Sequence, residues 1–172
     1  MSFEEARVII VVYLAVFLPL IIYFKYKSKL PDWVPTFYVL GVIVCALGWE
    51  LWFTYGWLDG DSVDLRRSEA LNTWLPKNIN WLMNSMGDAG AVLLGGAWLM
   101  WLVNGKDSSV FRELKWSAFG ILLFWCVSQN IIVEMFLYHD QLSNGKPLSW
   151  APLSPLGPYF NPVLFEFNNR TI

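Results

Sequence analysis

The chain has 172 residues, of which 56% are hydrophobic and only 15% are charged, and its formal net charge is −2. A soluble domain carries about 25% charged residues, and a nucleic-acid-binding domain is expected to be basic, so the composition argues against both classes. Apolar runs of about 20 residues, long enough to cross a bilayer as helices, and a mean hydropathy of +0.42 are typical of an integral membrane protein. Membrane lipids are therefore expected around the chain, and no nucleic acid.

Four apolar segments are predicted to be transmembrane helices, which makes the chain an all-α, polytopic membrane protein with one domain over residues 1–140. In chain order they are residues 8–24, 36–57, 79–103 and 116–138. The first segment follows the acidic leader MSFEEAR. A cleaved signal peptide begins with basic residues and ends at small ones, so we expect a retained helix, bent at Pro19.

The loops set the expected orientation. Six basic residues fall in the first and third loops, and four alternating spans place these loops on one side of the membrane: Lys25, Lys27, Lys29, Lys106, Arg112 and Lys115. Because positively charged loops stay in the cytoplasm, we expect both termini on the outer, periplasmic side of a bacterial inner membrane. The second loop is polar and is predicted to carry a short surface helix over residues 66–74.

The C-terminal tail, residues 141–172, is rich in proline and aromatic residues. It holds five of the nine prolines, at positions 147, 152, 155, 158 and 162, and proline does not continue a helix. Its apolar and aromatic residues are not the composition of a disordered segment. The tail is therefore predicted to be non-helical and packed on the outer face of the helical bundle.

Polar residues recur at helical spacing inside three of the four segments. Asn80, Asn84 and Asp88 are spaced i, i+4, i+8, which places them on one helix face. The fourth segment repeats the pattern with Asn130, Glu134 and Tyr138, next to Gln129, and the second segment carries Glu50 and Thr54. Because neighbouring spans run in opposite directions, all of these groups fall in the outer halves of their helices.

This layer predicts an outward-opening polar pocket. An ionised carboxylate in lipid costs several kcal/mol, so Glu50, Asp88 and Glu134 should face one another, water or a ligand. Three neighbouring carboxylates cannot all stay ionised cheaply, which makes them candidate catalytic acid and base groups. The predicted ligand-binding residues are Asn80, Asn84, Asn130, Gln129, Tyr138 and Thr54, with Trp49, Trp52 and Trp125 as aromatic walls.

The alternative interpretation is structural. Asn, Gln and Asp in membrane helices often serve only as interhelical hydrogen-bonding groups, and tryptophans of membrane proteins often face lipid. No cofactor and no metal are expected, because the chain has one histidine, no Glu-x-x-His pair and no glycine-rich phosphate loop. An ion site made of the three carboxylates alone stays open. Cys45 and Cys126 are expected to be buried, free thiols.

Three stretches resemble the EXPERA domain, the superfamily of emopamil-binding protein and the sigma-2 receptor. They are GWELWFTYGW with Glu50, NSMGDAGA with Asp88, and VSQNIIVEMFLYHD. The resemblance covers about residues 42–140, and it implies acidic residues on successive membrane helices around a sterol-like or drug-like ligand. One turn before Glu50, where sterol isomerases of the family carry histidine, this chain has Ala46. In place of the last membrane helix of the family stands the Pro-rich tail, or the sequence stops short of that helix. These differences count against sterol isomerisation in particular.

Three functions compete on these grounds. The first is a protein that binds a hydrophobic, sterol-like or isoprenoid-like molecule, with acid–base isomerisation as its catalytic form. The second is a non-catalytic accessory subunit that assembles with other membrane subunits, which suits a small chain with an apolar tail. The third, a proton or ion pathway, needs polar groups through the full membrane depth, and the inner halves of the predicted spans hold almost none.

Overall fold

The computed structural model describes the backbone of residues 1–55, 57–58, 61–62, 65, 67–133, 166–167 and 170–171, and side chains within residues 1–51, 54–55, 65 and 67–133. The helices are α1 (Phe3–Tyr26), α2 (Val34–Leu47), α3 (Trp49–Tyr55), α5 (Glu69–Trp74), α6 (Lys77–Gly87), α7 (Gly95–Val103) and α8 (Trp116–Ile132). A π-helical segment, η2 (Asp88–Leu94), joins α6 to α7, and two 3-10 turns are η1 (Lys27–Lys29) and η3 (Ser108–Phe111).

Four two-residue strands form two small antiparallel pairs. β1 (Trp57–Leu58) pairs with β2 (Asp61–Ser62), with Trp57 opposite Ser62, and β3 (Glu166–Phe167) pairs with β4 (Arg170–Thr171). Apart from these pairs, the ordered elements in the described part of the chain are helical, which confirms the all-α prediction at that level. The predicted packing of the tail on the bundle lies outside the described residues.

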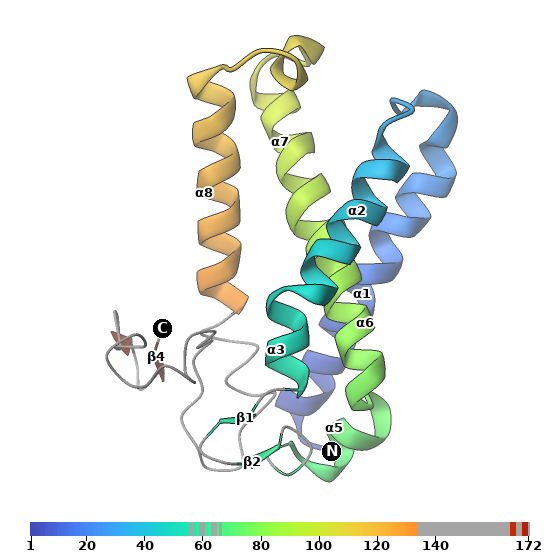
Figure 1. Cartoon of the computed structure of the whole chain (residues 1–172), viewed down its shortest axis with the longest axis vertical. Coiled ribbons are helices and arrows are strands. Elements are labelled where there is room, and N and C mark those ends of the chain that lie inside the picture. Colours follow the sequence, from blue (N-terminus) through green and yellow to red (C-terminus); the bar gives the residue numbers. More distant parts are fainter. Residues whose placement is uncertain are drawn as a thin grey trace.

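One long helical stretch, formed by α6, η2 and α7, organises the molecule (Figure 1). Its first part, α6 and η2, packs against α1, α2 and α3, whereas α7 packs against α8. Small residues allow the close approach: a Cβ on Gly41 of α2 would lie 2.9 Å from Leu93 Cδ2, and one on Gly90 would lie 3.1 Å from Pro19. Pro19 thus sits inside α1 at its contact with η2.

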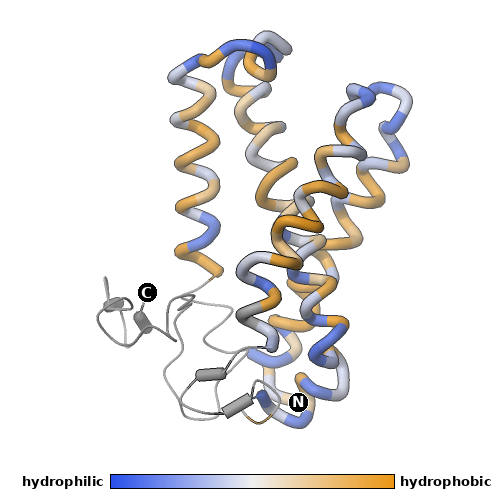
Figure 2. The backbone as a smooth tube through the Cα atoms, in the orientation of Figure 1, coloured by the Kyte–Doolittle hydropathy of each residue, from blue (hydrophilic) through white to orange (hydrophobic). Residues whose placement is uncertain are grey.

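The helices expose their apolar side chains. Along α1 the side chains of Ile10, Leu14 and Leu18 are all more than half exposed, while buried Val8 and Val16 face the bundle. Hydrophobic residues run along the helices, and hydrophilic residues collect at their two ends (Figure 2). Two helical stretches, Phe3–Lys29 and Lys77–Val103, are long and apolar enough to cross a membrane by length and composition, while α2 and α8 are shorter apolar helices.

The second apolar segment differs from the prediction of one helix over residues 36–57. It breaks at Gly48, which has φ −89° and ψ −121° and separates α2 from α3. A Cβ at this position would lie 2.7 Å from the carbonyl oxygen of Val44, so glycine is needed for the close approach of the backbone. The break reorients the chain just before Glu50.

The other predicted helices agree with the structure over the described residues. The segment 79–103 lies within the continuous stretch Lys77–Val103, although its π-helical part was not predicted. The surface helix predicted over 66–74 is α5, whose N-cap Ser68 accepts a hydrogen bond from the Leu71 amide. The helix predicted over 116–138 is described as far as residue 133.

The two basic loops lie at the same end of the molecule, as predicted, at the top of Figure 1. They also touch, because the rings of Trp33 and Phe111 pack with their centroids 5.2 Å apart. The amino terminus, α5 and the β1–β2 pair lie at the opposite end. Both cysteines are free, as predicted.

Candidate functional site

Buried polar side chains occur on α3 and on α6, two helices that pack against each other. Glu50 is 2% exposed and Thr54 is 1% exposed on α3, and Asn80 is 3% exposed on α6. Glu50 and Thr54 are one turn apart, so they share a helix face. We call these three residues the polar layer. In its surroundings of apolar helices, a buried polar group is stable only when it is hydrogen-bonded or solvated.

The break at Gly48 positions Glu50. Because α2 ends at Leu47, the last carbonyl groups of that helix lack partners within it. The indole Nε1 of Trp81 donates a hydrogen bond of 2.9 Å to the carbonyl oxygen of Ala46, which joins α6 to the end of α2. Ala46 is the residue at the position where the resemblance would require a histidine. At this position the alanine side chain supplies no imidazole group, and the backbone carbonyl of Ala46 accepts the hydrogen bond from Trp81 of α6.

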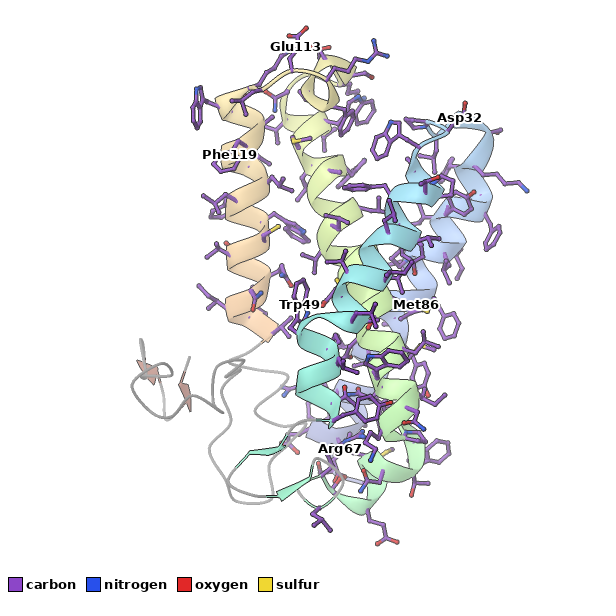
Figure 3. The ribbon with its side chains drawn as sticks, viewed as in Figure 1. Asp32, Trp49, Arg67, Met86, Glu113 and Phe119 are labelled. Atoms are coloured by element: carbon purple, nitrogen blue, oxygen red, sulfur yellow. The ribbon has the colours of Figure 1, made fainter. Side chains whose placement is uncertain are left out.

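Asp88 is linked to the start of α3. The indole Nε1 of Trp49 donates a 2.8 Å hydrogen bond to Asp88 Oδ2, which ties α3 to the first residue of η2. Trp49 and Met86, at the end of α6, lie near mid-length of the molecule in Figure 3. The Cys45 thiol is within electrostatic reach of both Asp88 and Glu50, so these two predicted carboxylates lie in the same region.

Other polar residues of α6 lie near Asn80 along the same helix. Asn84 follows Asn80 by one turn and is half-buried. Ser85, which the sequence did not single out, is fully buried, but its hydroxyl donates to the Trp81 carbonyl of its own helix at 2.7 Å. At the end of α3, the Tyr55 hydroxyl donates a 2.8 Å hydrogen bond to Asn78 Oδ1. One hydrogen bond thus joins the end of α3 to the start of α6.

On α8, two of the predicted site residues that the structure describes donate hydrogen bonds to η2 and to α8 itself. Trp125 Nε1 donates a 3.0 Å hydrogen bond to the Val92 carbonyl in η2, and Gln129 Nε2 donates to the Cys126 carbonyl of its own helix. Asn130 is exposed. Trp125 therefore serves the α7–α8 packing. Glu134 and Tyr138 lie outside the described residues, as does the Trp52 side chain, and their predicted roles stay predictions.

Arg67 is a buried residue that sequence reasoning missed. It is 3% exposed, and its Nη2 donates hydrogen bonds to the carbonyl oxygens of Leu71 and Leu75 at the C-terminal end of α5. The Leu71 carbonyl already accepts the Leu75 amide, so the guanidinium adds a second donor there and binds the Leu75 carbonyl beyond the end of the helix. Figure 3 places Arg67 toward the end of the molecule that carries the amino terminus. From the sequence, Arg67 was treated as one charged residue of the polar second loop. No sequence pattern distinguished it from its neighbour Arg66.

Among the described residues, no group of three or more His, Cys, Asp or Glu side chains could hold a metal ion. The one histidine, His139, lies outside them. The carboxylate, amide and hydroxyl groups of the described region can together accept hydrogen bonds from a polar molecule and donate hydrogen bonds to it.

The chain was compared with known protein families, with curated proteins and with solved structures, and no match was found in any of the three.

Proposed function

We propose that the chain is an integral membrane protein whose polar layer binds the head of a lipid-like molecule. In this proposal four spans cross the membrane. α2 and α3, of 14 and 7 residues joined by Gly48, make the second span, and α8, with 17 described residues, makes most of the fourth. About 17–25 residues span the hydrocarbon core. Lipid then covers the exposed apolar faces of the helices.

The same proposal assigns the orientation. The basic α1–α2 and α7–α8 loops, which lie at one end of the molecule, are placed in the cytoplasm by their lysine and arginine residues. Both ends of the chain then face the periplasm of a bacterial inner membrane. The polar layer on α3 and α6 then lies in the outer half of the bundle, where it is buried among the helices. A molecule that enters from the outer leaflet would reach it by displacing neighbouring side chains.

The observation that carries the proposal is the Thr54 hydroxyl. Its oxygen is buried and has no hydrogen-bond partner in the part of the chain that the structure describes. An unsatisfied buried hydroxyl costs about 1–3 kcal/mol, and threonine in a helix can usually avoid this by bonding to the carbonyl one turn before. A bound polar group at this point would remove the cost, on the same face of α3 as the Glu50 carboxyl.

These groups suit a hydroxyl-bearing amphiphile. A carboxyl group, an amide and a hydroxyl can together donate to and accept from one alcohol, as they would for a sterol-type or isoprenoid-type molecule. The apolar body of the ligand would lie along the helices in the lipid phase. An acid–base isomerisation would need a second acid or base beside Glu50, and Glu134 was predicted for that role. The proposal is therefore restricted to binding.

The test compares purified proteins by the lipids that they retain. Wild type, Thr54→Val, Asn80→Leu and Glu50→Gln are extracted in mild detergent, and the bound lipids are identified by chromatography and mass spectrometry. We expect one hydroxyl-bearing amphiphile to be enriched with wild type and at least tenfold depleted in Thr54→Val, which keeps the shape of the side chain. The matched control is Thr73→Val, which changes an exposed threonine on α5. Equal retention by Thr54→Val and Thr73→Val would refute the site.

A second function, an accessory subunit of a larger membrane complex, is favoured by the position of α8. The main contacts of this helix are with α7 and η2, while Phe119, Leu123 and Phe124 on its surface are exposed. A helix of a partner could cover this surface in place of lipid. Size analysis after mild extraction tests this function: a stable assembly with other chains supports it, and a monodisperse single chain counts against it.

A further inference from the structure

The two basic loops form one surface, which we call the cationic end. Its basic residues are Lys25, Lys27, Lys29, Lys106, Arg112 and Lys115. The loops are joined by the ring contact between Trp33 and Phe111, and Trp33 also packs edge-to-face on Phe37 at 5.5 Å. Residues about 80 positions apart in the sequence are thereby held together at one end of the molecule, at the top of Figure 1.

The charge of this end is opposite to that of the rest of the chain. The two loops contain six basic residues and three acidic ones, which leaves an excess of three positive charges. The acidic residues are Asp32, Asp107 and Glu113. The whole chain has 12 basic and 14 acidic residues, so the remainder carries six basic and 11 acidic residues, a net charge of −5. The cationic end therefore has the opposite net charge to the remainder of the sequence.

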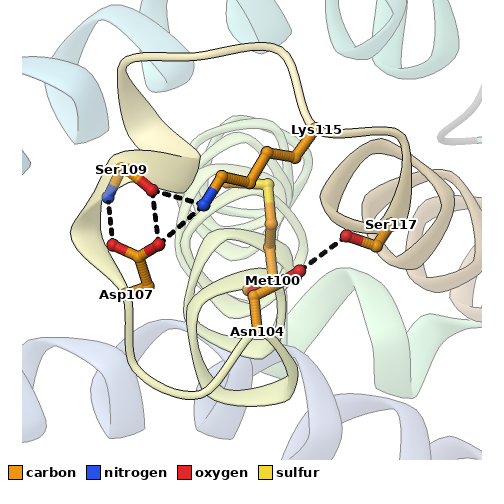
Figure 4. Close-up of polar contacts among 6 residues, drawn as sticks. All are labelled: Met100, Asn104, Asp107, Ser109, Lys115 and Ser117. Atoms are coloured by element: carbon orange, nitrogen blue, oxygen red, sulfur yellow. Dashed lines mark hydrogen bonds and ion pairs between the residues drawn. The ribbon is translucent and has the colours of Figure 1, made fainter.

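Five of the six basic side chains are exposed, and the sixth has a structural role (Figure 4). Lys115 Nζ lies 2.6 Å from Asp107 Oδ2 and also contacts the Ser109 hydroxyl. The Ser117 hydroxyl donates a 2.6 Å hydrogen bond to Asn104 Oδ1. These bonds fix the α7–α8 hairpin and neutralise Lys115. The five exposed basic residues stay available to a ligand: Lys25, Lys27, Lys29, Lys106 and Arg112.

Large apolar and aromatic side chains surround the same end. Leu114 and Trp116 are 77% and 75% exposed, and they flank Lys115 in the sequence. Tyr26 is also exposed, with the Lys25 ammonium 5.5 Å from the centre of its ring. Exposed aromatic residues next to basic ones are typical of the level at which a membrane protein meets the lipid head groups.

We propose that the cationic end binds the phosphate-bearing head groups of anionic phospholipids. Clusters of four to eight basic residues beside membrane helices recognise such lipids through their charge, and the five exposed basic residues fall in this range. The head-group site is separate from the polar layer. It shares with the proposed function only the placement of the chain in a membrane, and it adds a lipid partner at the opposite end.

The test offers the purified full chain, in non-ionic detergent, an equimolar mixture of dioleoyl phosphatidylglycerol and dioleoyl phosphatidylcholine, and counts bound lipids by native mass spectrometry. We expect the anionic lipid to be bound preferentially, with a preference that weakens as salt is added. Each exposed basic residue contributes about fivefold in affinity. The triple variant Lys25→Gln, Lys27→Gln, Lys29→Gln should therefore bind phosphatidylglycerol about a hundredfold more weakly.

The control is Lys77→Gln, at the start of α6 near the opposite end, which should keep the wild-type preference. All three lysines of the triple variant are exposed, and helical circular dichroism checks that this variant folds. Equal binding of the two lipids by wild type would overturn the proposal, and so would an unchanged preference in the triple variant. Complete displacement of phosphatidylglycerol by millimolar inorganic phosphate would also overturn it, because the site would then belong to a free anion.

Discussion

Replacing Gly96 by alanine tests the packing of α8 against α7. A Cβ at this position would lie 2.7 Å from Leu122 Cδ1 and 3.0 Å from Trp125 Cδ1. The end of the leucine side chain can move, but the indole of Trp125 is held by its hydrogen bond to the Val92 carbonyl. The added methyl group must therefore displace the ring, and break that bond, or separate the two helices.

The expected cost follows from these contacts. Overpacking of a well-packed interface costs about 1–3 kcal/mol, and interhelical hydrogen bonds in membranes contribute about 0.6 kcal/mol on average. We expect Gly96→Ala to lower the free energy of unfolding by about 2 kcal/mol. The adjacent Gly95 is the matched control, because the nearest atom to its Cβ would be 3.6 Å away on Trp125. Gly95→Ala should be neutral, or stabilising by up to about 1 kcal/mol through helix propensity.

The assay is unfolding in mixed detergent micelles by titration with dodecyl sulfate, followed by the helical circular dichroism signal. Both alanine variants are compared with wild type under the same conditions. The reasoning predicts that the two variants fall on opposite sides of wild type, or at least differ by more than 1.4 kcal/mol, a tenfold change in the unfolding equilibrium. Equal stability of Gly96→Ala and Gly95→Ala would refute the predicted α7–α8 contact.

Three further predictions concern hydrogen bonds. Trp49→Phe and Asp88→Ala each remove one partner of the 2.8 Å hydrogen bond from Trp49 Nε1 to Asp88 Oδ2. Their double-mutant cycle should give a coupling energy of about 1 kcal/mol, and a coupling near zero would contradict the bond. Trp81→Phe removes the donor to the carbonyl at the end of α2 and should cost about 1 kcal/mol in the same unfolding titration, and wild-type stability would count against this role. Hydrogen bonds from the Lys115 ammonium and from Ser109 hold the pKa of Asp107 well below its usual range. The stabilisation of the folded protein by the ionised Asp107 carboxylate should thus be fully present above the ordinary aspartate pKa of about 3.9. It should be lost as the pH falls through the lowered pKa of this carboxyl group. Carbon-13 NMR titration of Asp107 checks this, and an ordinary aspartate pKa, or one unchanged by Lys115→Gln, would be the contrary result.

Sequence patterns predicted those helices whose position is determined by the length and composition of the local sequence. The apolar run that became α1 and the stretch Lys77–Val103 were both recognised, because their length and composition are set by local sequence. The surface helix α5 was also recognised, and it begins after the capping residue Ser68. Free Cys45 and Cys126 agree with their prediction.

The features that sequence did not predict depend on distant partners. Gly48 looked like one more glycine within a helix, but the break there is held by Trp81, 35 positions away from the carbonyl of Ala46 that it binds. In the π-helical segment, the Val92 carbonyl accepts a hydrogen bond from Trp125 of α8, 33 positions away. Arg67 is buried because its guanidinium satisfies the end of α5, and no sequence pattern reports such a contact. The polar layer was predicted in part, since helical spacing placed Glu50 beside Thr54, whereas the burial of Asn80 depends on how α6 packs against other helices.

The most direct measurement is native mass spectrometry of the chain extracted in mild detergent from the membranes of its own source, without overexpression. If the polar layer binds a lipid-like molecule, the chain will be released as a monomer or dimer that carries one discrete small mass, and fragmentation will identify a hydroxyl-bearing amphiphile. A chain released bare, or released only from a larger assembly with other proteins, would contradict that account and would make Glu50, Thr54 and Asn80 structural contacts between helices.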